Sequence, residues 1–199
     1  MIQIVVPSCE ALSENVFLSL SAMENTKLVL MCTQEDYKEL EKKESFFNHI
    51  KNADKMICLK GEPAGPLCSC LMAIDEINNA DCVLVMDHVM DEKFNLSHIV
   101  EQFEDADCGV VTVASECTSL PHVLLDQDSK EIIEASQDRV LSDRASAGIY
   151  YFKHGTDLVE SAKNAIRKGC SVDNRYYITA AINEMILKNS KVKEVAFMK

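Results

Sequence analysis

The chain has 199 residues, of which 47% are hydrophobic and 26% charged, as is typical of a folded globular domain. Lys and Arg number 20 against 32 Asp and Glu, so the formal net charge is −12. Such a negative surface repels phosphate backbones and argues against a nucleic-acid partner. No apolar run in the sequence approaches the ~18 residues that a membrane helix needs, so we expect no membrane span.

The cysteines and the amino terminus indicate the compartment. The nine cysteines are an odd number and contain no Cys-x-x-Cys pair, which favours buried reduced thiols over a zinc site or a disulfide framework. The first residues show no basic leader followed by a long apolar stretch. We therefore expect a cytoplasmic protein.

The first half of the chain alternates short apolar runs with helical patterns. Four runs have the length and composition of strands: residues 2–6, 27–31, 55–59 and 82–86. The last of these is apolar at every position, as in a strand covered on both faces. Three segments show helical spacing of apolar residues, namely 12–23, the charge-rich segment 35–50, and 65–77, which begins with Gly65-Pro66.

The second half continues this alternation after one interruption. We expect a helix at 95–103, a buried strand at 109–114, a strand at 147–153, a helix capped by Thr156, a further helix at 178–186 and a last strand at 192–197. Between them, a polar turn at 126–129 joins two short strand candidates into a hairpin. The sequence predicts a single domain over 1–199, with a mixed, mostly parallel sheet between two helical layers and a hairpin insertion at about 115–145.

Asp87 is the first candidate for chemistry, because it directly follows the most apolar predicted strand. In open α/β sheets, ligands bind beyond the carboxyl ends of the central strands. One carboxylate at that place can hold Mg²⁺ together with substrate phosphates. The alternative is that Asp87 caps a turn or forms an ion pair.

Gly65 is the second candidate, because it precedes a predicted helix. Unpaired N–H groups at a helix start can recognise a base or a phosphate, and glycine allows a ligand to approach closely. The alternative is that Gly65-Pro66 only turns the chain.

Three segments together resemble a known family. They are residues 65–73 (Gly-Pro-Leu-Cys-Ser-Cys-Leu-Met-Ala), 83–87 (Val-Leu-Val-Met-Asp) and 142–155 (Ser-Asp-Arg-Ala-Ser-Ala-Gly-Ile-Tyr-Tyr-Phe-Lys-His-Gly). They resemble nucleotidyltransferases of the sugar-nucleotide pyrophosphorylase type, in particular the branch linked to bacterial capsule and surface-polysaccharide synthesis. This family shares its fold with GT-A glycosyltransferases. The resemblance covers about residues 55–190.

The resemblance implies an activity and a set of site residues. It implies an enzyme that joins a nucleoside triphosphate to a sugar phosphate or a similar acceptor, with Mg²⁺ as cofactor and release of pyrophosphate. Asp87 matches the metal-binding catalytic aspartate of the family, Gly65 and Ser69 match the base-recognising glycine and the hydroxyl residue after it, and Gly148 matches the glycine near the sugar. Arg139 falls near the family's glutamate-lysine pair. An assembly of identical chains stays open.

The chain also departs from the family pattern at its start. The family has a glycine-rich loop with cations that wrap the triphosphate, whereas this chain reads Ser8-Cys9-Glu10 and has no Lys or Arg before Lys27. A triphosphate needs backbone donors and cations, so this loop predicts weak triphosphate binding.

Two further departures concern the metal. Near Arg175, where the family pattern suggests a second metal-binding acid, the chain has a cation, and Asp173 is the nearest substitute. His88, directly after Asp87, has no second histidine at ligand spacing, which favours packing or hydrogen bonding over metal binding.

Three functions therefore remain open. The first is nucleotidyl transfer from a nucleoside triphosphate to a sugar phosphate in surface-polysaccharide synthesis. The second is a catalytically impaired homologue that binds a nucleotide, a sugar phosphate or a partner protein, which the missing loop favours. The third is a GT-A glycosyltransferase with a nucleotide-sugar donor, which needs no triphosphate loop.

Overall fold

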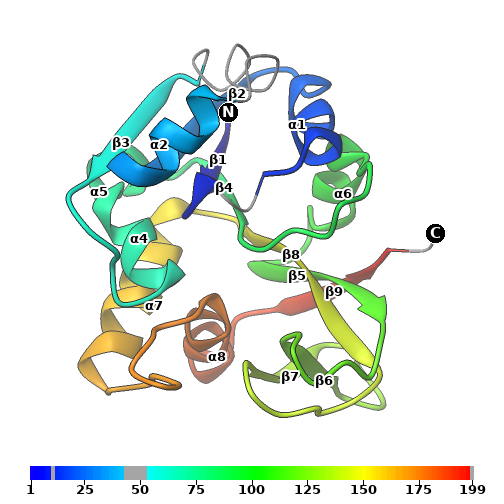
Figure 1. Cartoon of the computed structure of the whole chain (residues 1–199). Helices are drawn as coiled ribbons and strands as arrows, with labels where there is room; N and C mark the ends of the chain where they lie inside the picture. Colours follow the sequence, from blue (N-terminus) through cyan, green and yellow to red (C-terminus); the bar gives the residue numbers. More distant parts are fainter. Residues whose placement is uncertain (10–11, 43–52, 198–199) are drawn as a thin grey trace.

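The computed structural model describes residues 1–9, 12–42 and 53–197, and in them the chain forms a nine-stranded sheet (Figure 1). Seven strands follow one another in the order β3-β2-β1-β4-β8-β5-β9, and β6 and β7 lie off this path. The strands are β1 (Ile2–Val6), β2 (Thr26–Thr33), β3 (Lys55–Leu59), β4 (Cys82–Met86), β5 (Cys108–Ala114), β6 (His122–Leu125), β7 (Ile132–Ser136), β8 (Arg144–Phe152) and β9 (Val192–Ala196).

Helices cover both faces of the sheet. They are α1 (Glu14–Ser21), α2 (Gln34–Glu41), α4 (Pro66–Met72), α5 (Ile74–Ile77), α6 (Leu96–Gln102), α7 (Gly155–Arg167) and α8 (Ile178–Leu187). Alternate residues of the central strands fall into two buried clusters. One cluster includes Val16 of α1 and Ile99 of α6, and the other includes Leu67 of α4, Leu158 of α7 and Ile182 of α8. The expected three-layer α/β/α arrangement is confirmed.

The strand directions confirm a mixed, mostly parallel sheet. β3, β2, β1 and β4 are parallel neighbours, and β9 is parallel to β5. On the path through the described residues, β8 alone runs antiparallel to its neighbours β4 and β5. Because β8 runs in reverse, its middle lies beside the carboxyl end of β4. Met86 pairs with Ile149, and the Asp87 N–H donates a hydrogen bond to the Gly148 carbonyl at 2.9 Å.

Several expected elements differ from the observed ones. The helix expected over 65–77 is interrupted at Ala73, whose φ of −95° and ψ of 15° separate α4 from α5. The Thr156 cap is wrong: α7 begins at Gly155 with His154 as its N-cap. The first N–H groups of α7 instead donate to the Asp81 and Asn79 carbonyls, which replace a capping side chain.

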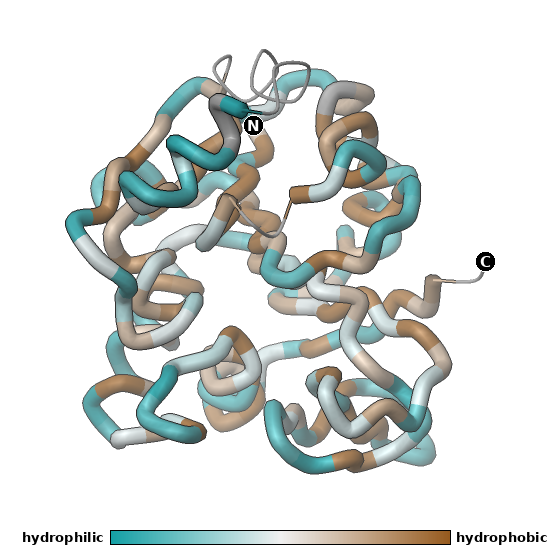
Figure 2. Tube along the Cα trace, viewed as in Figure 1, coloured by the Kyte–Doolittle hydropathy of each residue, from teal (hydrophilic) through white to brown (hydrophobic). Residues whose placement is uncertain are grey.

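The charge-rich segment at 35–50 can be compared only in part. α2 covers its beginning, and it is hydrophilic along most of its length, with Tyr37 packed against the core (Figure 2). Residues 43–52 lie outside the described residues. No helix among residues 1–9, 12–42 and 53–197 is long and apolar enough to cross a membrane.

The segment at 115–145 contains the β6–β7 hairpin. The Asp126 carboxylate accepts hydrogen bonds from the N–H groups of Asp128 and Ser129 at 3.1 and 2.8 Å, which stabilises the polar turn. At the other side of the hairpin, the Asn183 amide of α8 bonds both the N–H and the carbonyl of Ala135, at 2.9 and 2.8 Å. The hairpin is thus attached to α8 as well as to β8.

Candidate functional site

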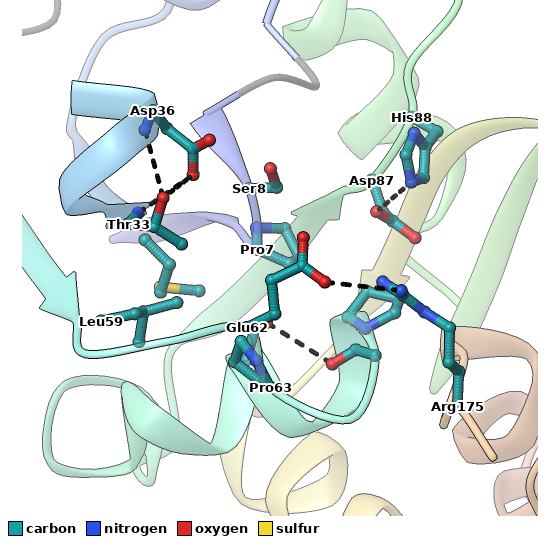
Figure 3. Close-up of a pocket in the computed structure, with 14 residues that line it drawn as sticks. Pro7, Ser8, Thr33, Asp36, Leu59, Glu62, Pro63, Asp87, His88 and Arg175 are labelled. Atoms are coloured by element: carbon teal, nitrogen blue, oxygen red, sulfur yellow. Dashed lines mark hydrogen bonds and ion pairs between the residues drawn. The ribbon is translucent and has the colours of Figure 1, made fainter. Parts of the chain in front are cut away.

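Asp87 lies at the carboxyl end of β4 and lines a pocket with a volume of about 100 Å³ (Figure 3). It is surrounded by the loops after β1, β3 and β4, the end of β2, the start of α4 and the segment before α8. We call it the Asp87 pocket, and its lining residues are Pro7, Ser8, Met31, Thr33, Asp36, Leu59, Glu62, Pro63, Gly65, Pro66, Ser69, Asp87, His88 and Arg175. The crevice expected beyond the central strand is therefore present.

Asp87 is buried, with 8% of the residue's surface exposed. Burial raises the pKa of its carboxyl group to about 6, against the opposing effect of the nearby His88 and Arg175. His88 Nε2 lies 3.7 Å from Asp87 Oδ1, but the His88 side chain is 75% exposed at the rim. Asp87 is thus a desolvated carboxylate that an added cation would stabilise.

Gly148 lies behind Asp87 and is absent from the pocket lining. Its φ is +84°, and a Cβ atom there would lie 2.4 Å from the Asp87 carbonyl oxygen and 2.8 Å from that of His88. Only glycine allows β8 to approach the main chain this closely. The structure shows a packing role for Gly148, and its contact with the sugar stays a prediction.

Gly65 and Ser69 line the same pocket as Asp87. Gly65 has a φ of +100°, and a Cβ atom there would lie 2.5 Å from the Tyr176 carbonyl oxygen. Its N–H donates to the Pro63 carbonyl at 2.7 Å, and the buried Ser69 hydroxyl donates to the Gly65 carbonyl at 3.4 Å. The structure therefore brings the two residues together with Asp87, although their polar groups also bond within the chain.

Arg139 lies in a different pocket, with a volume of about 280 Å³, between β7, α8 and the segment that joins α7 to α8. Its guanidinium pairs with Glu134 at 2.5 Å. We call this the Arg139 pocket, and it is lined by Ala135, Ser136, Gln137, Asp138, Arg139, Cys170, Ser171, Val172, Tyr177, Thr179, Ala180, Asn183, Glu184 and Leu187. The structure does not bring Arg139 to Asp87, and its substrate contact stays a prediction.

Asp173 is exposed and lines neither pocket. Asp173 and Asn174 both have positive φ, 49° and 60°, between the paired residues Val172 and Arg175. This is the conformation of a type I′ turn, which favours Asn and Asp. The turn directs the following residue, Arg175, to the Asp87 pocket, while metal binding by Asp173 stays a prediction.

The pocket contains polar residues to which the sequence alone assigns no role. Arg175 and Glu62 face each other across it, with Arg175 Nη1 3.9 Å from Glu62 Oε2. Asp36 accepts hydrogen bonds from the N–H and the hydroxyl of Thr33, at 3.0 and 2.6 Å, at the start of α2. The sequence does mark Arg175 as unusual, because a cation is present where the family pattern suggests an acid.

The residues of the Asp87 pocket fit Mg²⁺ only if waters and substrate phosphates supply most of its ligands. The described residues contain no group of three or more His, Cys, Asp or Glu side chains that could hold a metal ion. Asp87 supplies one buried carboxylate, which is enough for an ion that keeps several waters and is also bound by substrate phosphates. The site therefore suits Mg²⁺ that binds together with a nucleotide.

Comparison with known proteins gives structural matches only. No protein-family model and no curated protein sequence matches the chain. Among solved structures, it is similar to a nucleoside-diphosphate-sugar pyrophosphorylase from Vibrio cholerae RC9, with 14% identity, a TM-score of 0.77, and coverage of 98% of this chain and 91% of that one.

Two more solved structures are similar over nearly the whole chain. An inositol-1-phosphate CTP transferase from T. maritima has 12% identity and a TM-score of 0.67, covering 98% of this chain and 84% of that one. A candidate glucose-1-phosphate thymidylyltransferase from Bacillus anthracis, in complex with a sucrose, has 13% identity and a TM-score of 0.70, covering 100% of this chain and 87% of that one. At these identities the comparison establishes a shared fold, and the chain therefore has the fold of these nucleotide-transferring enzymes.

Proposed function

We propose that the protein is a nucleotidyltransferase that acts on a nucleotide and a sugar phosphate in the Asp87 pocket. One observation carries the proposal: a buried carboxylate with a raised pKa lies in a pocket at the carboxyl end of the central strand β4. The shared fold and the resemblance of residues 65–73, 83–87 and 142–155 support it. The same resemblance supports a role in surface-polysaccharide synthesis.

The reaction requires mainly positioning. An oxygen of the acceptor phosphate forms a bond to the α-phosphorus while the bond from that phosphorus to the bridging oxygen breaks, and pyrophosphate leaves. Asp87 would hold Mg²⁺, which neutralises phosphate charge when bound. The remaining pocket residues would align the acceptor oxygen with the α-phosphorus and exclude water.

A second candidate, a protein that binds nucleotide or sugar phosphate without catalysis, has one observation in its favour. Among the described lining residues of the Asp87 pocket, the basic side chains are Arg175 and His88, against the acidic Asp36, Glu62 and Asp87. A triphosphate carries more negative charge than one guanidinium neutralises. A glycosyltransferase with a nucleotide-sugar donor, the third candidate, would need fewer cations.

The experiment measures pyrophosphate release and thermal unfolding in parallel. Wild-type protein, Asp87→Asn and the exposed control Asp75→Asn are incubated with each of the four nucleoside triphosphates, Mg²⁺ and a panel of sugar 1-phosphates. We expect release that depends on Asp87 and is unchanged in the control. If the protein binds a nucleotide, that nucleotide should stabilise the folded state by about 2.7 kcal/mol at a hundredfold excess over its dissociation constant.

The other outcomes separate the candidates. Stabilisation by a triphosphate without release would favour the binding protein. Stabilisation by a nucleoside diphosphate or a nucleotide sugar, but by no triphosphate, would favour the glycosyltransferase. If no nucleotide changed the unfolding temperature, the proposal would be wrong.

A further inference from the structure

Among the described residues that line the Asp87 pocket, Arg175 is the one Lys or Arg side chain. Figure 3 shows it entering from the segment before α8, with the guanidinium between Glu62 and Asp87. It is near enough to act against the rise in the Asp87 pKa. An anion that enters the pocket therefore meets this guanidinium.

The main chain on both sides of Arg175 is fixed. Arg175 and Val172 exchange two backbone hydrogen bonds, of 2.9 and 3.0 Å, across the tight turn. The next residue, Tyr176, donates to the Ala64 carbonyl at 2.8 Å and accepts from the Leu67 N–H at 3.0 Å. These bonds attach the segment to the start of α4, so Arg175 is held at the pocket by its backbone.

The Arg175 side chain, in contrast, is only loosely paired. Its distance of 3.9 Å to Glu62 exceeds that of a hydrogen bond. The two side chains are 49% and 81% exposed, and exposed ion pairs are weak. A phosphate group accepts two parallel hydrogen bonds from a guanidinium, which a loose ion pair with Glu62 cannot match.

We propose that Arg175 binds a phosphate group of the substrate and that Glu62 competes with this phosphate for the guanidinium. The inference rests on the proposed function, because it identifies the phosphate contact of the same pocket. Arg175 then supplies positive charge that the loop after β1 lacks. The phosphate belongs either to the nucleotide or to the sugar phosphate, and separate probes of the two kinds distinguish them.

The test is isothermal titration of purified full-length protein with four sets of probes. They are inorganic pyrophosphate, glucose 1-phosphate, and each nucleoside triphosphate and diphosphate with Mg²⁺. The variants are Arg175→Gln, Arg175→Lys and Glu62→Gln. The matched control is Arg167→Gln, an exposed arginine of α7 whose guanidinium bonds to Asn164 and which lines neither pocket.

We expect Arg175→Gln to weaken binding of a phosphate probe by roughly 10- to 100-fold, the range of a charge-assisted hydrogen bond. Arg175→Lys should weaken it less, because it keeps the charge but loses the paired geometry. Glu62→Gln should tighten it, and Arg167→Gln should leave it unchanged. If the effect is confined to pyrophosphate and nucleotides, Arg175 contacts the nucleotide; if it is confined to glucose 1-phosphate, it contacts the acceptor.

Unchanged affinity of Arg175→Gln for probes that wild type binds would overturn this inference and leave the proposed function standing. If wild type bound none of the probes, both proposals would be wrong. If Arg175→Gln did not fold, the other two variants would still test the inference. Weaker binding of the phosphate probe by Glu62→Gln would refute the competition, and unchanged binding by Arg175→Lys would refute the paired hydrogen bonds.

Discussion

The main chain of Gly148 packs directly against the carbonyl group of Asp87, where a Cβ atom would lie 2.4 Å from the carbonyl oxygen. We expect Gly148→Ala to lower the free energy of unfolding by about 2–4 kcal/mol, because it adds both backbone strain and a steric clash. Urea unfolding measures this loss. The control is Gly169→Ala, which has a similar φ of +71° but open space around it. Equal losses of unfolding free energy in the two variants would show that the packing of Gly148 on Asp87 contributes nothing to stability.

Gly65 packs in the same way on Tyr176, the residue after Arg175. A Cβ atom at Gly65 would displace the Tyr176 carbonyl and with it the guanidinium of Arg175. We therefore expect Gly65→Ala to weaken binding of the phosphate probe whose affinity depends on Arg175, measured by titration at a temperature where the variant is folded. If the unfolding temperature fell and the affinity did not, Gly65 would stabilise the fold without positioning Arg175.

The buried Asp87 carboxyl makes stability depend on pH. Its pKa is about 6 in the folded protein, against the ordinary value of 3.8 for an aspartate side chain, so the folded state binds the proton more readily than the unfolded chain. The stabilisation is complete below about pH 4 and is lost as pH rises through 6, by up to about 3 kcal/mol. Asp87→Asn removes this loss, and we expect it to be more stable than wild type above about pH 7.

Unfolding by urea across this pH range measures the effect. The exposed control Asp75→Asn should keep the wild-type slope. An Asp87→Asn variant less stable than wild type above pH 7 would mean that the carboxylate stabilises the fold. This would contradict the expectation that a functional carboxylate is kept here at a cost in stability.

Asn183 connects α8 to the β6–β7 hairpin through two hydrogen bonds with Ala135. Asn183→Ala leaves both backbone groups of Ala135 without this partner, and we expect a loss of about 1–3 kcal/mol. Amide hydrogen exchange should increase in β7 more than in β4. Asn164→Ala, whose side chain accepts a hydrogen bond from the exposed Arg167, is the control. Unchanged exchange in β7 would show that the hairpin is held by other contacts.

The central strands could be predicted from the sequence because their burial is evident from their composition. β1, β4 and the edge strand β3 have the expected bounds, since each is a short, mostly apolar run that ends at Pro7 or at a charged residue. The interruption at Ala73 and the start of α7 could not be predicted. The start of α7 depends on carbonyl groups of residues 79 and 81, which reach it only in the folded chain.

The candidate site was predictable only where an element ends at the pocket. Asp87 follows β4, and Gly65 and Ser69 belong to the start of α4, so the topology brings all three together. Arg139 and Asp173 belong to loops, whose course depends on turn conformation and on contacts with α8. For the same reason, the position of Arg175 in the pocket could not be predicted, because it depends on the turn at Asp173.

The short segment between α7 and α8 borders two pockets at once. Cys170, Ser171 and Val172 line the Arg139 pocket, and Arg175 lines the Asp87 pocket. A molecule that displaced this segment in one pocket would change the shape of the other. By thermodynamic linkage such an influence is mutual, so occupancy of the second pocket would adjust the affinity of the first by the same factor in either direction.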